Sequence, residues 1–164
     1  MSFSNNLLVP DDGSVLAFAR VTTSTQGPEY VLGETRETKD GKKYRYVQFK
    51  DAVTYVAGQV CTPANTSWTA VTNDVAGGSS IAATTFAGIC VGVPAQNGYG
   101  WVQIGGVANV RGDGSVAADE AVVPHSVDGE ADTMAAGEEH LSFGRALDAD
   151  TGSPVTCSVL LNGW

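Results

Sequence analysis

The sequence predicts an all-β protein, a small barrel or sandwich of short strands with an extended N-terminal arm. Apolar residues come in short alternating or continuous runs, and Gly, Pro, Asn and Asp interrupt these runs before the 3.6-residue period of a helix can develop. Twenty glycines in 164 residues agree with a chain of many turns. A chain of this length fits one domain, with or without an arm.

Nine runs rich in β-branched and aromatic residues are the expected strands. They cover residues 15–22, 44–49, 54–61, 69–72, 88–93, 100–104, 121–124, 142–148 and 155–161. In the run 44–49 (YRYVQF), aromatic or aliphatic residues alternate with polar ones, which predicts a strand with one solvated face.

The first 35 residues differ in character from the rest. A short apolar start leads to Pro10, a turn follows at residues 11–13, and residues 22–28 are small and polar. We expect an arm over residues 1–35 and a β domain over residues 36–164. Phe3, Leu7 and Leu8 are too few to form a core, so they should contact the body or a neighbouring subunit. An ordinary first strand of the domain is the alternative.

Two pairs of segments suggest an internal repeat. Residues 52–63 resemble residues 114–124, and residues 86–106 resemble residues 143–163. In the second pair, Phe and Gly open a strand, a polar turn follows, and a hydrophobic strand closes on Gly. The repeat predicts two similar hairpin units that complete one barrel together. Chance similarity among Gly-rich β segments is the alternative.

Charge argues against nucleic acid as a partner. Eighteen acidic and nine basic residues give a net charge of −9 and a pI near 4.4, which disfavours phosphate binding. The basic cluster at residues 39–45 is expected to be a charged turn, with a docking patch for an acidic partner as the alternative. No run of about 18 apolar residues occurs, and residues 1–20 lack the pattern of a signal peptide, so we expect no membrane partner and synthesis in a cytoplasm.

No catalytic signature is present, and we expect a protein that is not an enzyme and needs no cofactor. The two histidines, His125 and His140, lie outside any known catalytic motif. Metal-ligand spacings such as CxxC and HExxH are absent, so no metal site is expected. The acidic residues 128–132 lack the pattern of a calcium loop and are interpreted as a solvated loop.

The cysteines and tryptophans are interpreted as packing residues. Cys61, Cys90 and Cys157 are odd in number and lie in apolar or β-branched runs, which predicts reduced core thiols. The tryptophans could form a sugar-stacking platform, but the apolar run 101–104 favours core or interface packing. They are Trp68, Trp101 and Trp164.

Four strings then resemble a known family. They are GYGWVQIGGVA at residues 98–108, GSVAADEAV at 114–122, FGRALDA at 143–149 and VTCSVLL at 155–161. Together they resemble the central signature of tailed-phage capsid decoration, or cement, proteins, over residues 44–164. Such relatives usually carry Gly-Asp where this chain has Asp119-Glu120, a departure that changes the turn.

The resemblance implies a small β protein on the outer surface of a phage head, usually a trimer, that locks neighbouring major capsid subunits together without catalysis. We therefore expect a virion protein made in the host cytoplasm, with the major capsid protein as partner. In a homotrimer, Tyr99 and Trp101 are the predicted interface residues, because aromatic side chains are enriched at interface cores. The alternatives are another virion β component, such as a tail or fibre module, and a carbohydrate-binding or loop-built enzymatic domain.

Overall fold

A computed structural model describes residues 22–162, except residues 24, 51–53, 75–84 and 151–154. Of the described residues, 43% lie in strands and none in an α-helix, which confirms the all-β prediction. One short 3₁₀ turn, η1, covers Glu139–Leu141. No helix among these residues is long and apolar enough to cross a membrane.

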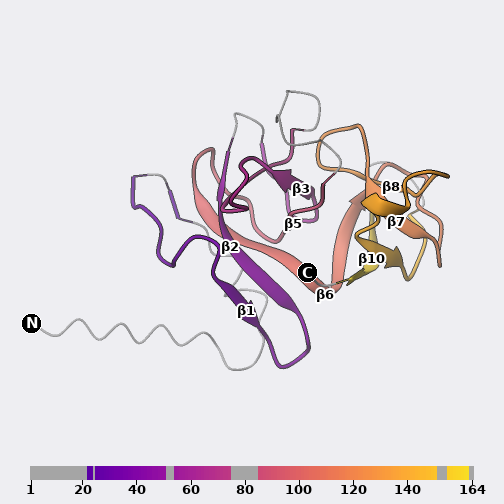
Figure 1. The fold of residues 1–164 in the computed structure, drawn as a ribbon, viewed down its shortest axis with the longest axis horizontal. Helices are drawn as coiled ribbons and strands as arrows, with labels where there is room; N and C mark the ends of the chain where they lie inside the picture. Colours follow the sequence, from indigo (N-terminus) through magenta and orange to yellow (C-terminus); the bar gives the residue numbers. More distant parts are fainter. Residues whose placement is uncertain (1–21, 24, 51–53, 75–84, 151–154, 163–164) are drawn as a thin grey trace, which may run out of the picture.

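Ten strands form one mixed sheet (Figure 1). They are β1 (Thr35–Glu37), β2 (Lys43–Phe49), β3 (Val60–Pro63), β4 (Ala70–Thr72), β5 (Gly88–Cys90), β6 (Tyr99–Gly112), β7 (Ala121–Pro124), β8 (Ala131–Thr133), β9 (Gly144–Ala146) and β10 (Val155–Asn162).

The strand pairings close two circuits that share β6. In the first, β2 runs parallel to β4, and antiparallel pairs then link β4 to β3, β3 to β5, β5 to β6 and β6 back to β2. In the second, β6 runs parallel to β8, and antiparallel pairs link β8 to β7, β7 to β9, β9 to β10 and β10 back to β6. The order and direction of the strands are the same in both circuits.

We call β2 to β5 with residues 99–104 the first unit, and residues 105–112 with β7 to β10 the second unit. The register between strands repeats as well: Pro63 pairs with Val71 in the first unit, and Pro124 pairs with Ala131 in the second. The segments that resemble each other in sequence thus occupy equivalent places in the two circuits. This agreement supports the predicted repeat over chance similarity.

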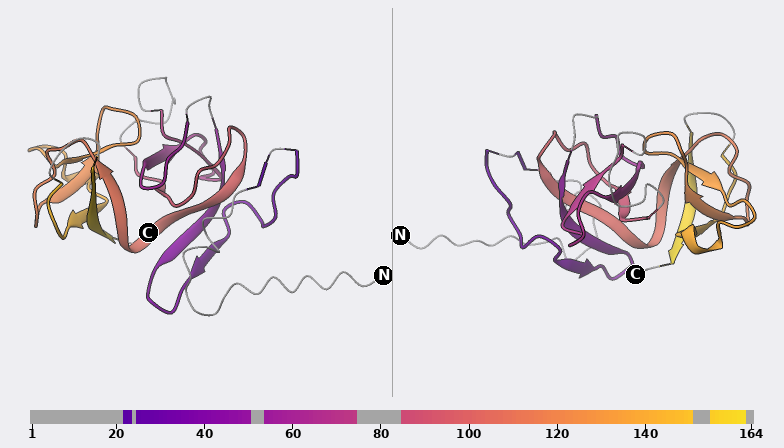
Figure 2. Two further views of the ribbon diagram at one scale, coloured as in Figure 1. Left: turned by 180° about the vertical axis from the view of Figure 1, so that it is seen from behind. Right: turned by 45° about the horizontal axis from the view of Figure 1, so that its top comes forward.

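Strand β6 is much longer than the predicted strand 100–104, because the glycines that we expected to end it bend it instead. Gly106 has a φ of 76°, and a Cβ there would lie 3.0 Å from the carbonyl oxygen of Gly41. Side chains avoid that backbone region, so glycine is required at the bend. The strand then continues along β10, and the two units lie on either side of the bend (Figures 1 and 2).

The larger of the two main apolar clusters contains residues of both units, and two phenylalanines pack against each other in it. Phe86 precedes β5 and Phe143 precedes β9, and their rings stack with centroids 4.4 Å apart and planes 8° apart. Both side chains are buried. This aromatic pair therefore lies at the junction of the units, with one ring from each.

The prediction of one solvated face for β2 is wrong. Val47 and Phe49 are buried in the core of the first unit, while Tyr44 and Tyr46, on the opposite face, are buried beside Trp101. Part of the cover on this second face comes from the segment before β1. The ring of Tyr30 lies 5.1 Å from that of Tyr46.

Several edges of the predicted strands also differ. Residues 54–59 do not form the start of β3, and neither β1 nor β8 was predicted. Strand β8 overlaps the acidic residues 128–132 at Ala131 and Asp132. We interpreted these residues as a loop because a run with three acidic residues has low β propensity. The expected strand 15–22 lies outside the described residues except for Thr22, which forms a bridge with Tyr99.

Candidate functional site

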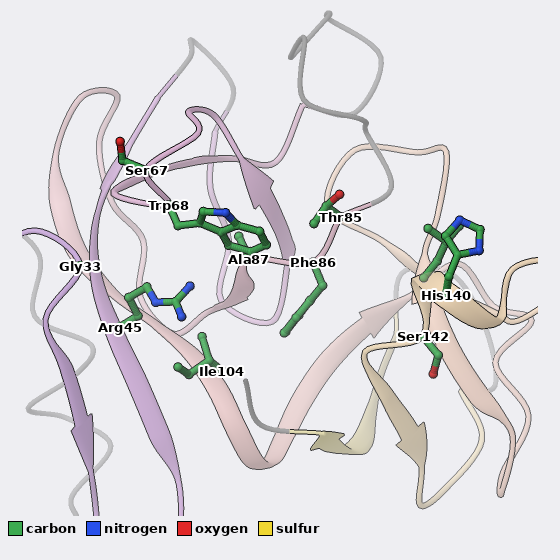
Figure 3. Close-up of a pocket in the computed structure, with 11 residues that line it drawn as sticks. Gly33, Arg45, Ser67, Trp68, Thr85, Phe86, Ala87, Ile104, His140 and Ser142 are labelled. Atoms are coloured by element: carbon green, nitrogen blue, oxygen red, sulfur yellow. The ribbon is translucent and has the colours of Figure 1, made fainter.

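An open groove of about 800 Å³ lies between the two units (Figure 3). Its floor is apolar and its rim carries hydroxyl groups, a guanidinium group and an imidazole. The lining residues are Gly33, Arg45, Ser67, Trp68, Thr85, Phe86, Ala87, Ile104, His140, Leu141 and Ser142. This size and this mixture of surfaces are typical of binding sites.

The turn between β3 and β4 places Trp68 on the rim. The side chain of Asn65 holds this turn: its Oδ1 accepts hydrogen bonds from the amides of Thr69 and Ala70 at 3.1 and 3.3 Å. Closure of the turn leaves Trp68 with a φ of 57°. The indole is 37% exposed and lies over the groove (Figure 3).

Arg45 reaches the groove from β2. Because side chains alternate along a strand, Arg45 shares a face with Val47 and Phe49, at the end where the core gives way to the groove (Figure 3). Its Cζ lies 5.8 Å from the ring centroid of Trp68. Burial lowers the pKa of the Arg45 guanidinium, which nevertheless stays protonated at neutral pH.

Arg45 differs from the other described arginines. Arg36, Arg111 and Arg145 lie 2.8, 3.3 and 3.6 Å from carboxylate oxygens. Among the described residues, the Arg45 guanidinium has neither a carboxylate nor a hydrogen-bond acceptor as partner. The groove therefore contains five unused N–H donors on one partly buried cation.

A second polar cluster lies in the second unit. Asp113, His125 and Asp132 each bring one possible metal-ligand atom within 4.8 Å of the others. His125 Nε2 is 3.8 Å from Asp113 and 4.0 Å from Asp132. The hydroxyl of Ser115 lies 2.7 Å from an oxygen of each carboxylate and can donate its proton to either.

The histidine tautomer favours an ionic cluster over a metal centre. Nδ1 of His125 accepts the amide hydrogen of Val127 at 3.1 Å, so the proton of the neutral ring lies on Nε2, the nitrogen that faces the two carboxylates. A metal would need the lone pair of that nitrogen. The arrangement instead suits an Nε2–H group between two carboxylates.

The cysteines are free and buried, which does not suit them to nucleophilic chemistry. The neighbouring Cys90 thiol and burial raise the pKa of Cys61 well above its usual range. Burial and the nearby carboxylates of Asp150 and Asp148 raise the pKa of Cys157 to about 11. Both thiols are protonated at neutral pH.

The predicted contact residues have mixed outcomes. Phe3, Leu7 and Leu8 lie outside the described residues, as do most of the arm and Trp164. Trp101 is only 3% exposed and packs within its own chain against Tyr46, while Tyr99 is partly buried beside the same cluster. Their place in a subunit interface stays a prediction, and core packing already explains the burial of Trp101.

Sequence reasoning missed the pairing of Arg45 with Trp68. Arg45 was assigned to a charged turn, and Trp68 was one of three scattered tryptophans. The repeat contained a usable signal, because the turn after Pro63 aligns with the turn after Pro124, and the second turn has Gly129 where the first has a bulky residue. His125 and Asp132 could have been placed together in the same way, since β7 and β8 meet at that turn.

The comparisons with known proteins leave the chain without an assigned family. No protein-family model and no curated protein matches it. The groove, its unpaired cation and its exposed indole are therefore the features from which function must be argued.

Proposed function

We propose that this chain is a capsid decoration protein that binds the outer surface of a phage head and stabilises contacts between major capsid subunits. The observation that carries the proposal is the groove between the units. It offers a partner an apolar floor, an exposed indole and an unpaired guanidinium, which are the kinds of group that dominate binding energy at protein interfaces.

The position of the family-like strings in the fold adds support. The strings at residues 98–108 and 155–161 lie on β6 and β10, which pair along eight residues from Val155–Gly112 to Asn162–Gly105. The string at 143–149 contains β9, which pairs with β10. The resemblance thus falls on β9, on β10 and on β6, the strand that the two units share.

The finer architecture belongs to the same proposal. In place of the one shared barrel that the repeat predicts, the two circuits would be two small barrels with β6 in common. Residues 1–35 would be an arm that contacts the body or a neighbour, and three copies would form a closed ring on a local threefold axis of the shell. Each trimer would then engage several coat subunits at once, so that weak contacts add. This role implies that the protein is made in the host cytoplasm and is located on the outer surface of the virion.

The test is co-sedimentation of the purified full chain with empty shells of the major capsid protein encoded in the same genome. The proposal predicts saturable binding in a fixed ratio to coat subunits and a higher melting temperature of the decorated shell. Binding to purified tails but not to shells would support the alternative of a tail or fibre module. Binding to neither would contradict the proposal.

A carbohydrate-binding function is the second candidate, and one observation favours it. The ring of Trp68 is exposed beside the hydroxyl-bearing residues Ser67 and Thr85, an arrangement that can stack a sugar ring and bond its hydroxyls (Figure 3). A glycan array probed with the labelled full chain tests this candidate. Binding that is lost in Trp68→Gly would favour it over the capsid.

A further inference from the structure

The β3–β4 turn and the β7–β8 turn follow equivalent prolines, Pro63 and Pro124, and the first turn is one residue longer than the second. The β3–β4 turn closes with a hydrogen bond from the Ala64 amide to the Ala70 carbonyl, and the β7–β8 turn with one from His125 to Glu130, both 2.9 Å long. Each turn contains one residue with a left-handed backbone. It is Trp68 in the first turn (φ 57°) and Gly129 in the second (φ 72°).

Each turn needs one residue with a left-handed backbone, and glycine adopts that conformation without steric cost. A tryptophan there brings its Cβ close to the following carbonyl, which costs about 1–2 kcal/mol. Strain of this kind concentrates at functional sites, where the surrounding structure holds it. The presence of Trp68 is therefore better explained by what its ring contacts than by the turn.

The surroundings of the two residues agree with this difference. Gly129 is buried, and a Cβ there would lie 2.8 Å from the side chain of Gln59. The carbonyl of Gly129 also accepts the amide hydrogen of Val60. The β7–β8 turn thus packs inside the molecule at Gly129, whereas the β3–β4 turn places the Trp68 indole over the groove (Figure 3).

The groove is suited to bind a negatively charged group as well as an apolar one. Arg45 is the one described arginine without a carboxylate partner, and it lies beside Trp68. A guanidinium binds carboxylates through paired N–H donors. The floor below it is formed by Phe86, Ala87 and Ile104, all of them at most 5% exposed.

We propose that the groove is the docking site for a protein segment that carries a large apolar side chain beside an aspartate or glutamate. The apolar side chain packs between the Trp68 indole and the floor at Ile104 and Phe86, and the carboxylate accepts hydrogen bonds from Arg45. Naming the coat protein as the source of this segment rests on the proposed function, but the site itself does not.

The chemistry of the floor favours a protein segment over a sugar. The floor residues Phe86, Ala87 and Ile104 have no hydrogen-bonding side chain, so any sugar hydroxyl that pointed at them would stay unpaired, which is costly in an apolar site. The unpaired cation further selects for a negative charge. An apolar side chain next to a carboxylate satisfies both parts of the groove.

The test is selection of random heptapeptides displayed on phage against the immobilised full chain, with counter-selection against Trp68→Gly. We expect the enriched peptides to share an aromatic or large aliphatic residue within two positions of Asp or Glu. A synthetic peptide with that sequence should bind the wild type, and Arg45→Gln should weaken its affinity by about tenfold or more. Arg145→Gln, which changes an exposed arginine outside the groove, is the matched control and should leave the affinity unchanged.

Three outcomes overturn the docking site: no enriched sequence, enriched peptides without acidic residues whose binding ignores Arg45→Gln, or displacement of the peptide by maltotriose. The shell assay separates this proposal from the proposed function. Peptide binding without shell binding supports the groove and contradicts the decoration role. Shell binding that both Trp68→Gly and Arg45→Gln leave unchanged supports the decoration role and contradicts the groove.

Discussion

The two units share strand order, direction and register, yet they differ in the contacts that their turns and strand ends make. In the second unit, the β7–β8 turn and the strand ends beside it pack against other parts of the molecule: Gly129 lies against Gln59, and Arg111 forms an ion pair with the buried Glu130. In the first unit, the equivalent turn faces an open groove with Trp68, and Arg45 lies beside it without a charged partner. Because the shared chain path already accounts for the fold, the places where the units diverge locate the function.

The largest expected effect concerns the contact that joins the units. Phe143→Ala should lower the free energy of unfolding by about 3–5 kcal/mol, because it empties a fully buried ring position. Phe86→Ala should cost nearly as much, since the two rings stack on each other. Urea denaturation of both variants measures these losses.

The double variant tests whether the phenylalanines act as a pair. A coupling energy of about 0.5–1.5 kcal/mol between them is expected for a stacked aromatic pair. Additive losses would mean that each ring serves its own unit and that the junction is not shared.

Much of this comparison was available from the sequence. The aligned segments 86–106 and 143–163 contain the equivalent strand pairs β5–β6 and β9–β10, and Ala121–Pro124 has the predicted bounds. Short strands such as Thr35–Glu37 were missed because three polar residues in a row show no alternation of apolar and polar side chains. They form because a neighbouring strand supplies the hydrogen bonds.

The groove was less predictable than the fold. Its lining comes from segments that are distant in sequence, from Gly33 to Ser142, and only the pairing of strands brings them together. The charge of Arg45 predicted a solvent-exposed side chain, since arginines are mostly exposed. Its position above an apolar floor follows from the face of β2 on which it lies, and both faces of that strand proved to be covered.

A smaller effect distinguishes the two turns by their side-chain hydrogen bonds. Asn65→Ala should cost about 1–2 kcal/mol, because Asn65 holds the amides of Thr69 and Ala70 in a turn that contains a strained residue. The equivalent Ser126 is exposed, and Ser126→Ala should change stability by less than about 0.5 kcal/mol. Thermal melts of the two variants provide the comparison, and equal losses would remove the distinction.

Alkaline pH should destabilise the two units over different pH ranges. Burial, and to a lesser extent the charge of Asp40, raise the pKa of Tyr44 to about 12 from 10.0, so the fold favours the neutral phenol. That contribution is complete below pH 10 and is lost as the pH rises toward 12. For Cys157 in the second unit, with a pKa raised from 9.0 to about 11, the loss begins near pH 9.

Melting temperatures recorded from pH 9 to pH 12 test both windows. Tyr44→Phe should flatten the fall between pH 10 and 12, and Cys157→Ala should flatten the fall between pH 9 and 11. If neither variant changes the slope, these two groups do not control the alkaline loss of stability.

The smallest expected effect on stability is that of Arg45→Gln. Since no described carboxylate or hydrogen-bond acceptor pairs with this guanidinium, which has only the exposed ring of Trp68 beside it, its removal should change the free energy of unfolding by less than about 0.5 kcal/mol. Arg111→Gln is the contrasting variant, because it leaves the carboxylate of Glu130 buried and unpaired, which costs about 1–3 kcal/mol. Urea denaturation that ranks Arg45→Gln as the more damaging variant would show that Arg45 serves the fold.

The most direct test is the free energy of unfolding of Trp68→Gly, measured by urea denaturation beside the wild type. If the fold needs only a left-handed residue at this turn, relief of about 1–2 kcal/mol of strain should offset the lost packing of the ring, and the variant should stay within about 1 kcal/mol of the wild type. A loss of about 3–5 kcal/mol, the size expected when a buried core tryptophan is removed, would contradict the account and assign Trp68 to the core.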